Sequence, residues 1–357
     1  MPNSRIELSR AAVNHNQKWV RDQLREGVEL SVVVKGNAYG HGIREFVPLA
    51  VEAGCDHFSV YSDYEAQEVA EVTGPGCRIM IMGDVELDNL PWIIGNGIEF
   101  YVFELSRLDA AIEAARAGGR RARIHLELET GMNRTGVREE DLPVFVQRLK
   151  DHAEHLEMEG ICTHFAGAES IANHVRVMRQ LEKFHRMVEG LRSSGIQARF
   201  LHTACSAAAL RYPESQLDLV RSGILNYGFW PSRELMVQYL DIDDGIEDPL
   251  KRVVSWKSYL MSTKTVRKGE FVGYGMSFLS YGSRRIGIVP VGYAHGYARA
   301  LSNQGVFLVH GRRVSVIGMV NMNATTVDLS TVPEAQVGDE VVVIGTSGDA
   351  HASVCLL

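Results

Sequence analysis

Short apolar segments alternate with longer amphipathic segments between residues 30 and 228. Segments such as DYEAQEVAEV and SRLDAAIEAARAG have the apolar spacing of helices packed on a core. Eight strand–helix units predict an α/β fold with a closed (β/α)₈ TIM-type barrel. An open doubly wound sheet is the alternative, because strand number alone does not prove closure. The eight predicted strands lie at 30–36, 57–62, 78–83, 99–104, 122–129, 159–165, 199–204 and 217–224.

The pattern changes after residue 240 to strand-like segments with turn residues and little helix. We therefore expect residues 8–235 to form the barrel and residues 236–357, with residues 1–7, to form a mostly β C-terminal domain. The acidic stretch 241–250 is expected to be a surface loop at the join, because its charge keeps it out of a core. The predicted strands of this domain lie at 253–266, 285–293, 305–311, 313–320, 325–330 and 340–345.

Composition narrows the class of protein. The 357 residues are 45% hydrophobic and 23% charged, as in ordinary globular proteins. A net charge of -7 argues against nucleic acid or an anionic membrane as partner. The five cysteines form no C-x-x-C pair, so we assign neither a disulfide framework nor a metal site. The chain has no signal-peptide pattern and no apolar run long enough to span a bilayer, so we expect a cytoplasmic protein.

Lys35 stands at the end of the first predicted strand. The segment SVVVKGNAYGHG (31–42) runs from buried β-branched residues into this charged amine and then into a series of glycines. One interpretation is that the amine extends from the barrel rim to water. The other is a desolvated amine of lowered pKa that forms a Schiff base with a carbonyl cofactor or substrate.

Polar and small residues also follow the later strands. In a parallel barrel the functional groups lie at the C-terminal strand ends. Chance would scatter such residues over all loops, so their concentration at one rim favours a functional role for Lys35. Besides Lys35, the residues at these ends are Arg134, His164, Ser206, Arg221, Gly223 and Ile224.

The last two barrel loops have the composition of a phosphate site. ACSAAA (204–209) and RSGI (221–224) consist largely of small residues, which let backbone N–H groups approach an anion. A phosphate pocket opposite a Schiff-base lysine matches the two needs of pyridoxal 5′-phosphate. Ser206 could also be a helix N-cap, and both roles can hold together.

These motifs resemble those of the alanine racemase family of fold-type III pyridoxal phosphate enzymes, in the same order and almost from end to end. The matching segments are VVKGNAYGHG, ETGMNRTGV, GICTHFAGAE, the stretch from HTACSAAALRYP to VRSGILNYG, and GYAHGYARAL. By this resemblance, Lys35 would carry the cofactor. Arg221 would face its pyridine nitrogen, and His164 would belong to the hydrogen-bonded set beside a catalytic tyrosine. The phosphate would be held by Tyr39, Ser206, Gly223 and Ile224.

The resemblance also implies a homodimer with shared active sites. Tyr274 and Met322 would come from the partner subunit, although an aromatic residue beside glycines often packs at a strand bulge instead. Tyr293 and Arg299 would line the substrate corridor, and Arg134 would bind the substrate carboxylate.

Racemisation removes the Cα proton from one face and returns a proton to the other, so two acid/base groups must flank that carbon. Lys35 and Tyr274 would be this pair. Positive charge from His164 and Arg221 would help Tyr274 to lose its proton.

Several positions depart from the family pattern. Glu127 stands where the family usually has a carbamylated lysine, and its carboxylate could brace Arg134 in simpler form. Cys205 replaces an asparagine. The chain ends at HASVCLL, before the segment that normally brings a phosphate-contacting tyrosine, so we expect one contact fewer or a shortened chain. Further departures lie at Met319, Asn321 and Asn323, which make the corridor less charged, and at His295, which replaces an aspartate.

We therefore predict a homodimeric pyridoxal phosphate racemase for a small amino acid, with alanine as the first choice. A serine or broad-specificity racemase is one alternative. A non-catalytic pyridoxal phosphate-binding paralogue is another, favoured by Cys205 and Met319. Two opposed bases count against it, because a carrier does not need them.

Overall fold

The computed structural model describes residues 3–240 and 247–352. Contacts group the chain into two compact units, Arg10–Lys251 and a second unit of Met1–Ser9 with Arg252–Leu357. The boundary expected from the sequence, between residues 235 and 236, falls within helix α10 (Arg233–Leu240). Residues 241–246 of the acidic stretch, Cys355 and the chain end lie outside the described residues.

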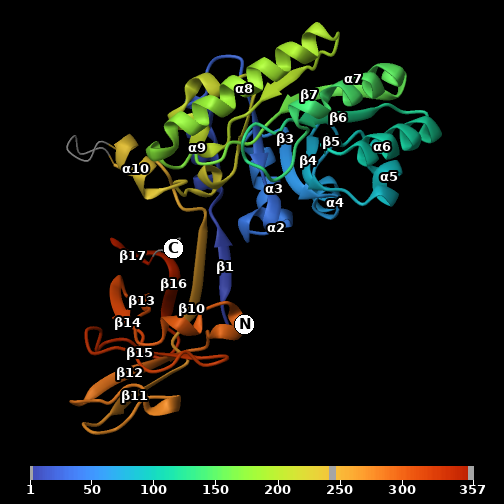
Figure 1. Ribbon diagram of the computed structural model, residues 1–357. Coiled ribbons are helices and arrows are strands. Elements are labelled where there is room, and N and C mark those ends of the chain that lie inside the picture. The colour runs from blue at the N-terminus through green and yellow to red at the C-terminus, as the bar shows by residue number, and fades with distance from the viewer. Residues whose placement is uncertain (1–2, 241–246, 353–357) are drawn as a thin grey trace. The chain divides into compact units, whose positions relative to one another are not determined.

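The first unit, here called the barrel unit, contains eight parallel strands in the order β8-β7-β6-β5-β4-β3-β2-β9 (Figure 1). The sheet nearly closes, because the amides of Asp218 and Arg221 donate to the carbonyls of Leu201 and Ala204, each at 3.0 Å. This order confirms the barrel and excludes the doubly wound sheet, in which the strand order reverses. The strands are β2 (Glu29–Val33), β3 (His57–Ser62), β4 (Arg78–Asp84), β5 (Glu99–Val102), β6 (Ala122–Glu127), β7 (Leu156–Cys162), β8 (Phe200–His202) and β9 (Leu219–Ser222).

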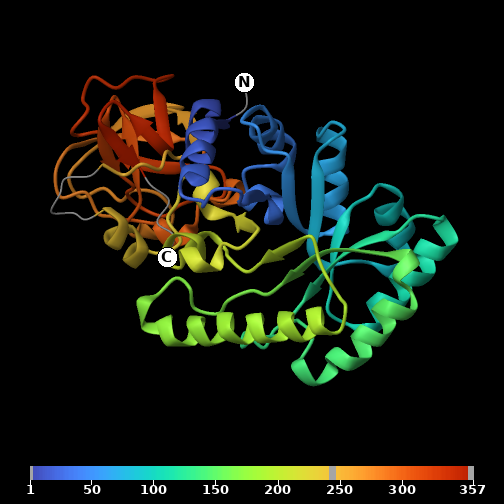
Figure 2. The same cartoon turned by 90° about the horizontal axis from the view of Figure 1, so that it is seen from above.

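Amphipathic helices separate these strands, as the sequence pattern predicts. Helix α8 is the longest, and in Figure 2 it is the yellow-green helix along the outer side of the barrel unit. Its buried residues recur at three- and four-residue spacing, so one apolar stripe packs inward. No helix in the described part of the chain is long and apolar enough to cross a membrane. Helix α8 spans His174–Ser193, and the short segment α2 (Lys35–Tyr39) is a turn with left-handed backbone. The other helices of this unit, besides α10, are α1 (Arg10–Asp22), α3 (Ile43–Glu52), α4 (Asp63–Val72), α5 (Leu90–Gly95), α6 (Leu105–Gly118), α7 (Leu142–Asp151) and α9 (Ser206–Arg211).

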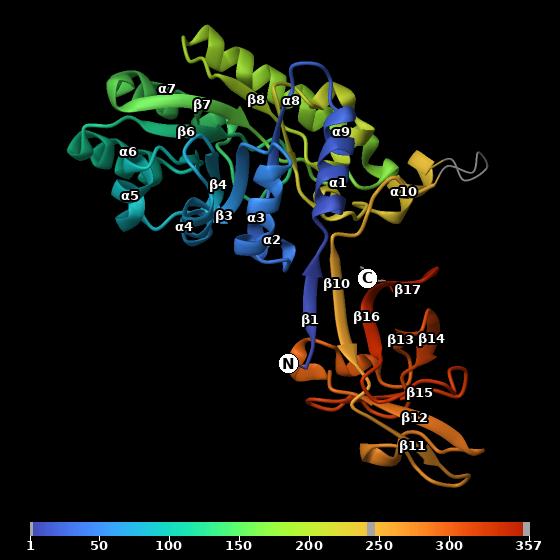
Figure 3. The ribbon, with the colours of Figure 1, turned by 180° about the vertical axis from the view of Figure 1, so that it is seen from behind.

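The second unit, here called the β unit, is mostly sheet, as predicted. One sheet has the order β1-β10-β16-β13-β14 with β17 beside β16, and a second has the order β11-β12-β15. Strand β1 lies antiparallel to β10, so the start of the chain joins this unit (Figure 3). The strands are β1 (Arg5–Leu8), β10 (Val254–Tyr259), β11 (Ser262–Val266), β12 (Arg284–Val289), β13 (Val306–Val309), β14 (Arg312–Ser315), β15 (Thr325–Asp328), β16 (Glu340–Ser347) and β17 (Ala350–Ala352).

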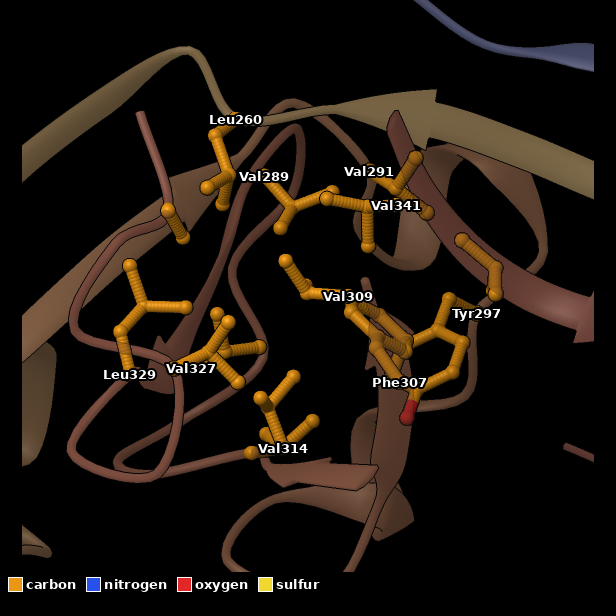
Figure 4. Close-up of a cluster of buried hydrophobic side chains, with 14 of the residues drawn as sticks. Leu260, Val289, Val291, Tyr297, Phe307, Val309, Val314, Val327, Leu329 and Val341 are labelled. Atoms are coloured by element: carbon orange, nitrogen blue, oxygen red, sulfur yellow. The ribbon is translucent and has the colours of Figure 1, made fainter. Parts of the chain in front are cut away.

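The core of the β unit is built from side chains of both sheets. Figure 4 shows Phe307 and Val309 of β13 facing Val327 of β15 and Val341 of β16. These side chains are fully buried. Burying a side chain of this size stabilises the fold by about 1.5–3 kcal/mol, so this core contributes to the stability of the β unit.

Candidate active site

The C-terminal ends of the barrel strands bring the predicted site residues together. Lys35 follows β2, His164 follows β7, and Arg221 is on β9. Burial, then Arg134 and Arg221, lowers the pKa of Lys35, although part of this side chain is exposed. Since Arg134 and Arg221 also lower the pKa of His164, these four groups share one electrostatic environment.

The turn after Lys35 has an unusual backbone. Gly36, Asn37, Ala38 and Tyr39 all have positive φ, between 53° and 64°. Left-handed backbone costs a non-glycine residue about 1–2 kcal/mol, so the surroundings must hold the turn. The carboxylate of Glu65 accepts hydrogen bonds from the amides of Gly36 (2.6 Å) and Asn37 (3.2 Å). The backbone of this turn therefore sets the directions in which the Lys35 and Tyr39 side chains leave the chain.

Tyr39 lies next to the small residues predicted to hold a phosphate. The hydroxyl of Ser206 accepts a hydrogen bond from the Gly223 amide at 2.9 Å. A Cβ on Gly223 would lie 2.4 Å from the Tyr39 hydroxyl oxygen, so only glycine leaves this space open. Burial, then Cys205, raises the pKa of Tyr39 to about 12, so its hydroxyl stays protonated and can donate to an anion. Ile224 begins the short helix that follows Gly223.

The N-cap interpretation of Ser206 is wrong. The N-cap of α9 is Cys205, and Ser206 is the first helical residue. Its hydroxyl turns to the end of β9, where it also lies 3.3 Å from the hydroxyl of Ser222. Tyr39, Ser206 and Gly223 thus form a cluster of hydroxyl and amide groups with the chemistry of a phosphate site. A lysine amine of lowered pKa belongs to the same end of the barrel. These features fit pyridoxal phosphate.

Arg221 is only 4% exposed, and four hydrogen bonds orient it. Its Nη1 contacts Nδ1 of His202 and donates to the His202 carbonyl at 3.1 Å. Its Nη2 donates to the carbonyls of Thr163 (2.9 Å) and Thr203 (3.2 Å). The charge of Arg221 is therefore held in one position.

His164 is neutral near pH 7. Burial, followed by the charges of Arg221, Arg134 and Lys35, lowers its pKa to about 3. The expectation that His164 supplies positive charge is therefore wrong. Desolvation and three nearby cations make a further positive charge on His164 unfavourable.

The loop that carries Arg134 folds around a carboxylate that sequence reasoning missed. Glu129 accepts hydrogen bonds from the amides of Gly131 and Asn133, the latter at 2.8 Å. Arg134 is exposed. Glu127 is 4% exposed and burial raises its pKa, against the lowering effects of a hydrogen bond to Thr135 and the charge of Arg134. Glu127 therefore acts on Arg134 through space, rather than through a close ion pair.

Three glycine-rich loops meet in the β unit. The amide of Tyr293 donates to the Asn321 carbonyl at 3.0 Å, and the next amide donates to the carbonyl of Met322 at 2.9 Å. A Cβ on Gly275 would lie 2.7 Å from the sulfur of Met319, so the loop of Tyr274 packs closely on the same segment. Ser302 links Arg299 to these loops. Its hydroxyl donates a hydrogen bond to the Arg299 carbonyl and accepts one from the Val320 amide.

Tyr274 is 77% exposed and Met322 is 55% exposed. The packing interpretation of Tyr274 is therefore wrong, because its ring contributes little to the core of the β unit. The two side chains instead stand on one exposed loop cluster.

Sequence reasoning missed the residues that support the site. Glu65 lies in an ordinary amphipathic helix, and Tyr227 and His202 lie among apolar neighbours. The ring of Tyr227 packs on Tyr39 with 4.9 Å between centroids, and its hydroxyl donates to the Val33 carbonyl at 2.9 Å. No local pattern identifies such contacts, because their partners are far away in the chain.

Comparison with known proteins identifies the family. Residues 8–231 match the model of the alanine racemase N-terminal domain, and residues 253–355 match that of the C-terminal domain. Alanine racemase of Halothermothrix orenii is 34% identical over 98% of this chain and 88% of its own length. That of Desulfovibrio desulfuricans is 34% identical over 95% of this chain and 88% of its own.

Solved structures agree with this assignment. The crystal structure of alanine racemase from Bacillus anthracis with bound L-Ala-P has a TM-score of 0.87 and 29% identity, over 99% of this chain and 88% of that one. Alanine racemase from Streptomyces lavendulae has a TM-score of 0.88 and 31% identity, over 98% and 90%. The chain therefore belongs to the alanine racemase family.

Proposed function

We propose that this protein interconverts L-alanine and D-alanine with pyridoxal 5′-phosphate as cofactor. One observation carries the proposal. The barrel unit combines, at the ends of its strands, a lysine of lowered pKa with the cluster of hydroxyl and amide groups of Tyr39, Ser206 and Gly223. The crystal structure of the Bacillus anthracis relative with bound L-Ala-P supports alanine as substrate.

Two groups of residues at the C-terminal ends of the barrel strands would hold the cofactor. Lys35 would bind its aldehyde, and Tyr39, Ser206, Gly223 and Ile224 would bind its phosphate. Bound pyridoxal phosphate would act as an electron sink that makes the substrate Cα proton easier to remove. Arg221 would donate to the pyridine nitrogen, and because arginine is permanently charged it would keep this nitrogen unprotonated.

Lys35 and Tyr274 are the proposed acid/base pair. The lowered pKa of Lys35 increases the fraction of neutral amine at pH 7, so Nζ can accept a proton. The hydroxyl oxygen of Tyr274 would hold the second proton on the opposite face of the substrate. Arg134 is exposed, so its guanidinium is accessible to the carboxylate of an amino acid.

We further propose a cytoplasmic homodimer in which the second copy supplies Tyr274. The loop cluster of the β unit exposes large apolar side chains, which marks a surface for association. Met322 would enter the partner's site with it, and Tyr293 and Arg299 would line the corridor. The exposed apolar side chains of this surface include Tyr274, Met276, Met322 and Phe271.

The decisive experiment is turnover of pure L-alanine followed by chiral chromatography. We expect D-alanine to form until both enantiomers are equal. L-serine, L-lysine and L-arginine are assayed in parallel, because Met319 and Asn321 alter the corridor. Faster turnover of any of these would replace alanine as the substrate, and no turnover of any amino acid by protein that binds the cofactor would favour the non-catalytic paralogue. An active monomer in sedimentation would contradict the shared site.

A further inference from the structure

A line of buried polar side chains crosses the barrel interior beneath the candidate active site. It joins Arg221 on β9 to Glu99 on β5 through His202 on β8 and His125 on β6. Glu99, His125 and His202 are fully buried. Polar groups buried to this extent are costly unless each is paired, so the hydrogen bonds between them determine which atoms carry protons.

The direction of these hydrogen bonds follows from the first residue. Arginine can only donate, so Nδ1 of His202 must accept from Arg221 and carries no proton. A neutral His202 then has its proton on Nε2, which lies 2.9 Å from Nδ1 of His125. If His125 donated here instead, both nitrogens of His202 would be acceptors, which requires an imidazolate anion. His202 therefore donates to His125.

The same reasoning applies to the next bond. Because Nδ1 of His125 accepts, its proton is on Nε2, 2.9 Å from a carboxylate oxygen of Glu99. A carboxylate is the natural end of such a series, because it only accepts. Burial raises the pKa of Glu99, but hydrogen bonds from His125 and His57 lower it by more, so the pKa lies well below its usual range. Every bond from Arg221 to Glu99 thus runs in one direction.

The charges of this network balance. The other oxygen of Glu99 forms an ion pair with Arg123 at 3.1 Å, and Arg123 pairs with the buried Glu159 at 2.6 Å. Two arginines and two glutamates therefore belong to this network, with neutral histidines between Arg221 and Glu99, and only Arg123 reaches solvent in part. Breaking up such a set is unfavourable, because a single buried charge would remain unpaired.

Gly160 makes the histidine pair possible. It lies on β7, between the strands of His125 and His202. A Cβ at this position would lie 2.1 Å from Nδ1 of His125 and 2.9 Å from Nε2 of His202. Any larger residue would separate the two nitrogens that share the central proton. Glycine at position 160 therefore allows the contact between His125 and His202.

We propose that Glu99 positions Arg221 through His125 and His202, two neutral histidines that each carry the proton on Nε2. The four contacts of Arg221 leave its Nε–H as the remaining donor, and the series holds that donor in one orientation. Glu99, His125 and His202 are positioning residues, since none belongs to the phosphate pocket or the proposed acid/base pair. That Arg221 serves a pyridine nitrogen rests on the proposed function, whereas the direction of the series does not.

The first test measures the tautomers in the cofactor-free protein. Long-range ¹⁵N–¹H NMR spectra of ¹⁵N-histidine-labelled protein distinguish protonated Nε2 from protonated Nδ1, and His125→Gln and His202→Gln spectra assign the signals. We expect both histidines as the Nε2–H form. A proton on Nδ1 of either ring, or a doubly protonated ring, would overturn the proposal.

The second test measures the effect on Arg221. Hydrogen exchange of its Nε–H, observed in ¹⁵N-arginine-labelled protein, should be at least tenfold faster in His125→Leu. His57→Leu is the matched control, because His57 is equally buried and lies 3.4 Å from the same carboxylate oxygen, but outside the series. Equal exchange in both variants would refute the positioning role. If His125→Leu does not fold, His125→Gln replaces it: the amide can both accept and donate, so exchange near the wild-type rate supports the role, and exchange tenfold faster contradicts it.

The third test uses the cofactor. Titration of the cofactor-free protein with pyridoxal phosphate, followed by absorbance, should show at least fivefold weaker binding and a shifted maximum for His125→Leu, but not for His57→Leu. If the wild-type protein binds no pyridoxal phosphate, the proposed function fails, and the first two tests still decide the series of hydrogen bonds.

Discussion

Polar side chains at the open end of the barrel differ from those in its interior in burial and in hydrogen bonding. In the interior, Glu99, His125 and His202 are fully buried and each is hydrogen-bonded. At the open end, Lys35 and Arg134 are exposed at least in part. Paired interior groups define positions, whereas the outer groups retain hydrogen-bonding capacity for a ligand. The difference separates residues that build the site from residues that bind.

The largest effect is expected at the open end, from Lys35→Ala. This variant should lose the absorbance of bound pyridoxal phosphate and, with it, at least about 10³-fold of the alanine racemisation rate. Lys18→Ala is the control, because Lys18 is an exposed lysine paired with Asp22 on α1. An unchanged spectrum of purified Lys35→Ala would contradict the cofactor assignment and the comparison drawn from it.

Tyr274→Phe tests whether the β unit supplies the second base. The rate should fall by about 10²–10⁴-fold, because a positioned acid/base group is lost. Binding of pyridoxal phosphate should remain, since Tyr274 is absent from the proposed phosphate pocket. Tyr281→Phe, at another exposed tyrosine of the same unit, is the control. Full activity of Tyr274→Phe would remove this residue from the mechanism.

The interior should respond to pH through its buried histidines. Burial is the first cause that lowers the pKa of His57 and His202. In the unfolded chain each returns to a pKa of about 6.5 and binds a proton below it. The unfolded state then binds more protons, so stability is retained above about pH 6.5 and lost below it.

Each histidine that stays neutral in the fold should cost about 1.4 kcal/mol of unfolding free energy per pH unit below pH 6.5. Urea unfolding between pH 7.5 and 5.5 measures this loss. A free energy of unfolding that does not decrease over this range would show that these histidines are not held neutral.

The smallest effect on activity is expected from Glu127→Gln. Glu127 is a buried carboxylate at the end of β6. The variant keeps the shape of the side chain and removes its charge near Arg134, so KM for L-alanine should rise by roughly tenfold while kcat changes little. Because burial raises the pKa of Glu127, this carboxyl protonates above its usual range as the pH falls. The wild type should therefore lose substrate affinity toward acid pH, and Glu127→Gln should not. A parallel pH profile for both proteins would exclude this role.

The sequence alone determined the architecture and the order of the site motifs. Alternation of apolar and amphipathic segments predicts the eight barrel strands, because burial on both faces leaves a clear local pattern. Lys35, Ser206 and Arg221 could be placed at strand ends for the same reason. The short strand β17 (Ala350–Ala352) was missed, since three residues show no periodicity.

Only the tertiary structure decided how these residues act. The neutral state of His164 depends first on burial and then on three cations from distant parts of the chain. The turn after Lys35 depends on a carboxylate from helix α4. The line from Arg221 to Glu99 joins residues of four strands, and Gly160 fits between two of them. Charge, desolvation and close approach depend on distances in space, and a sequence pattern records only distances along the chain.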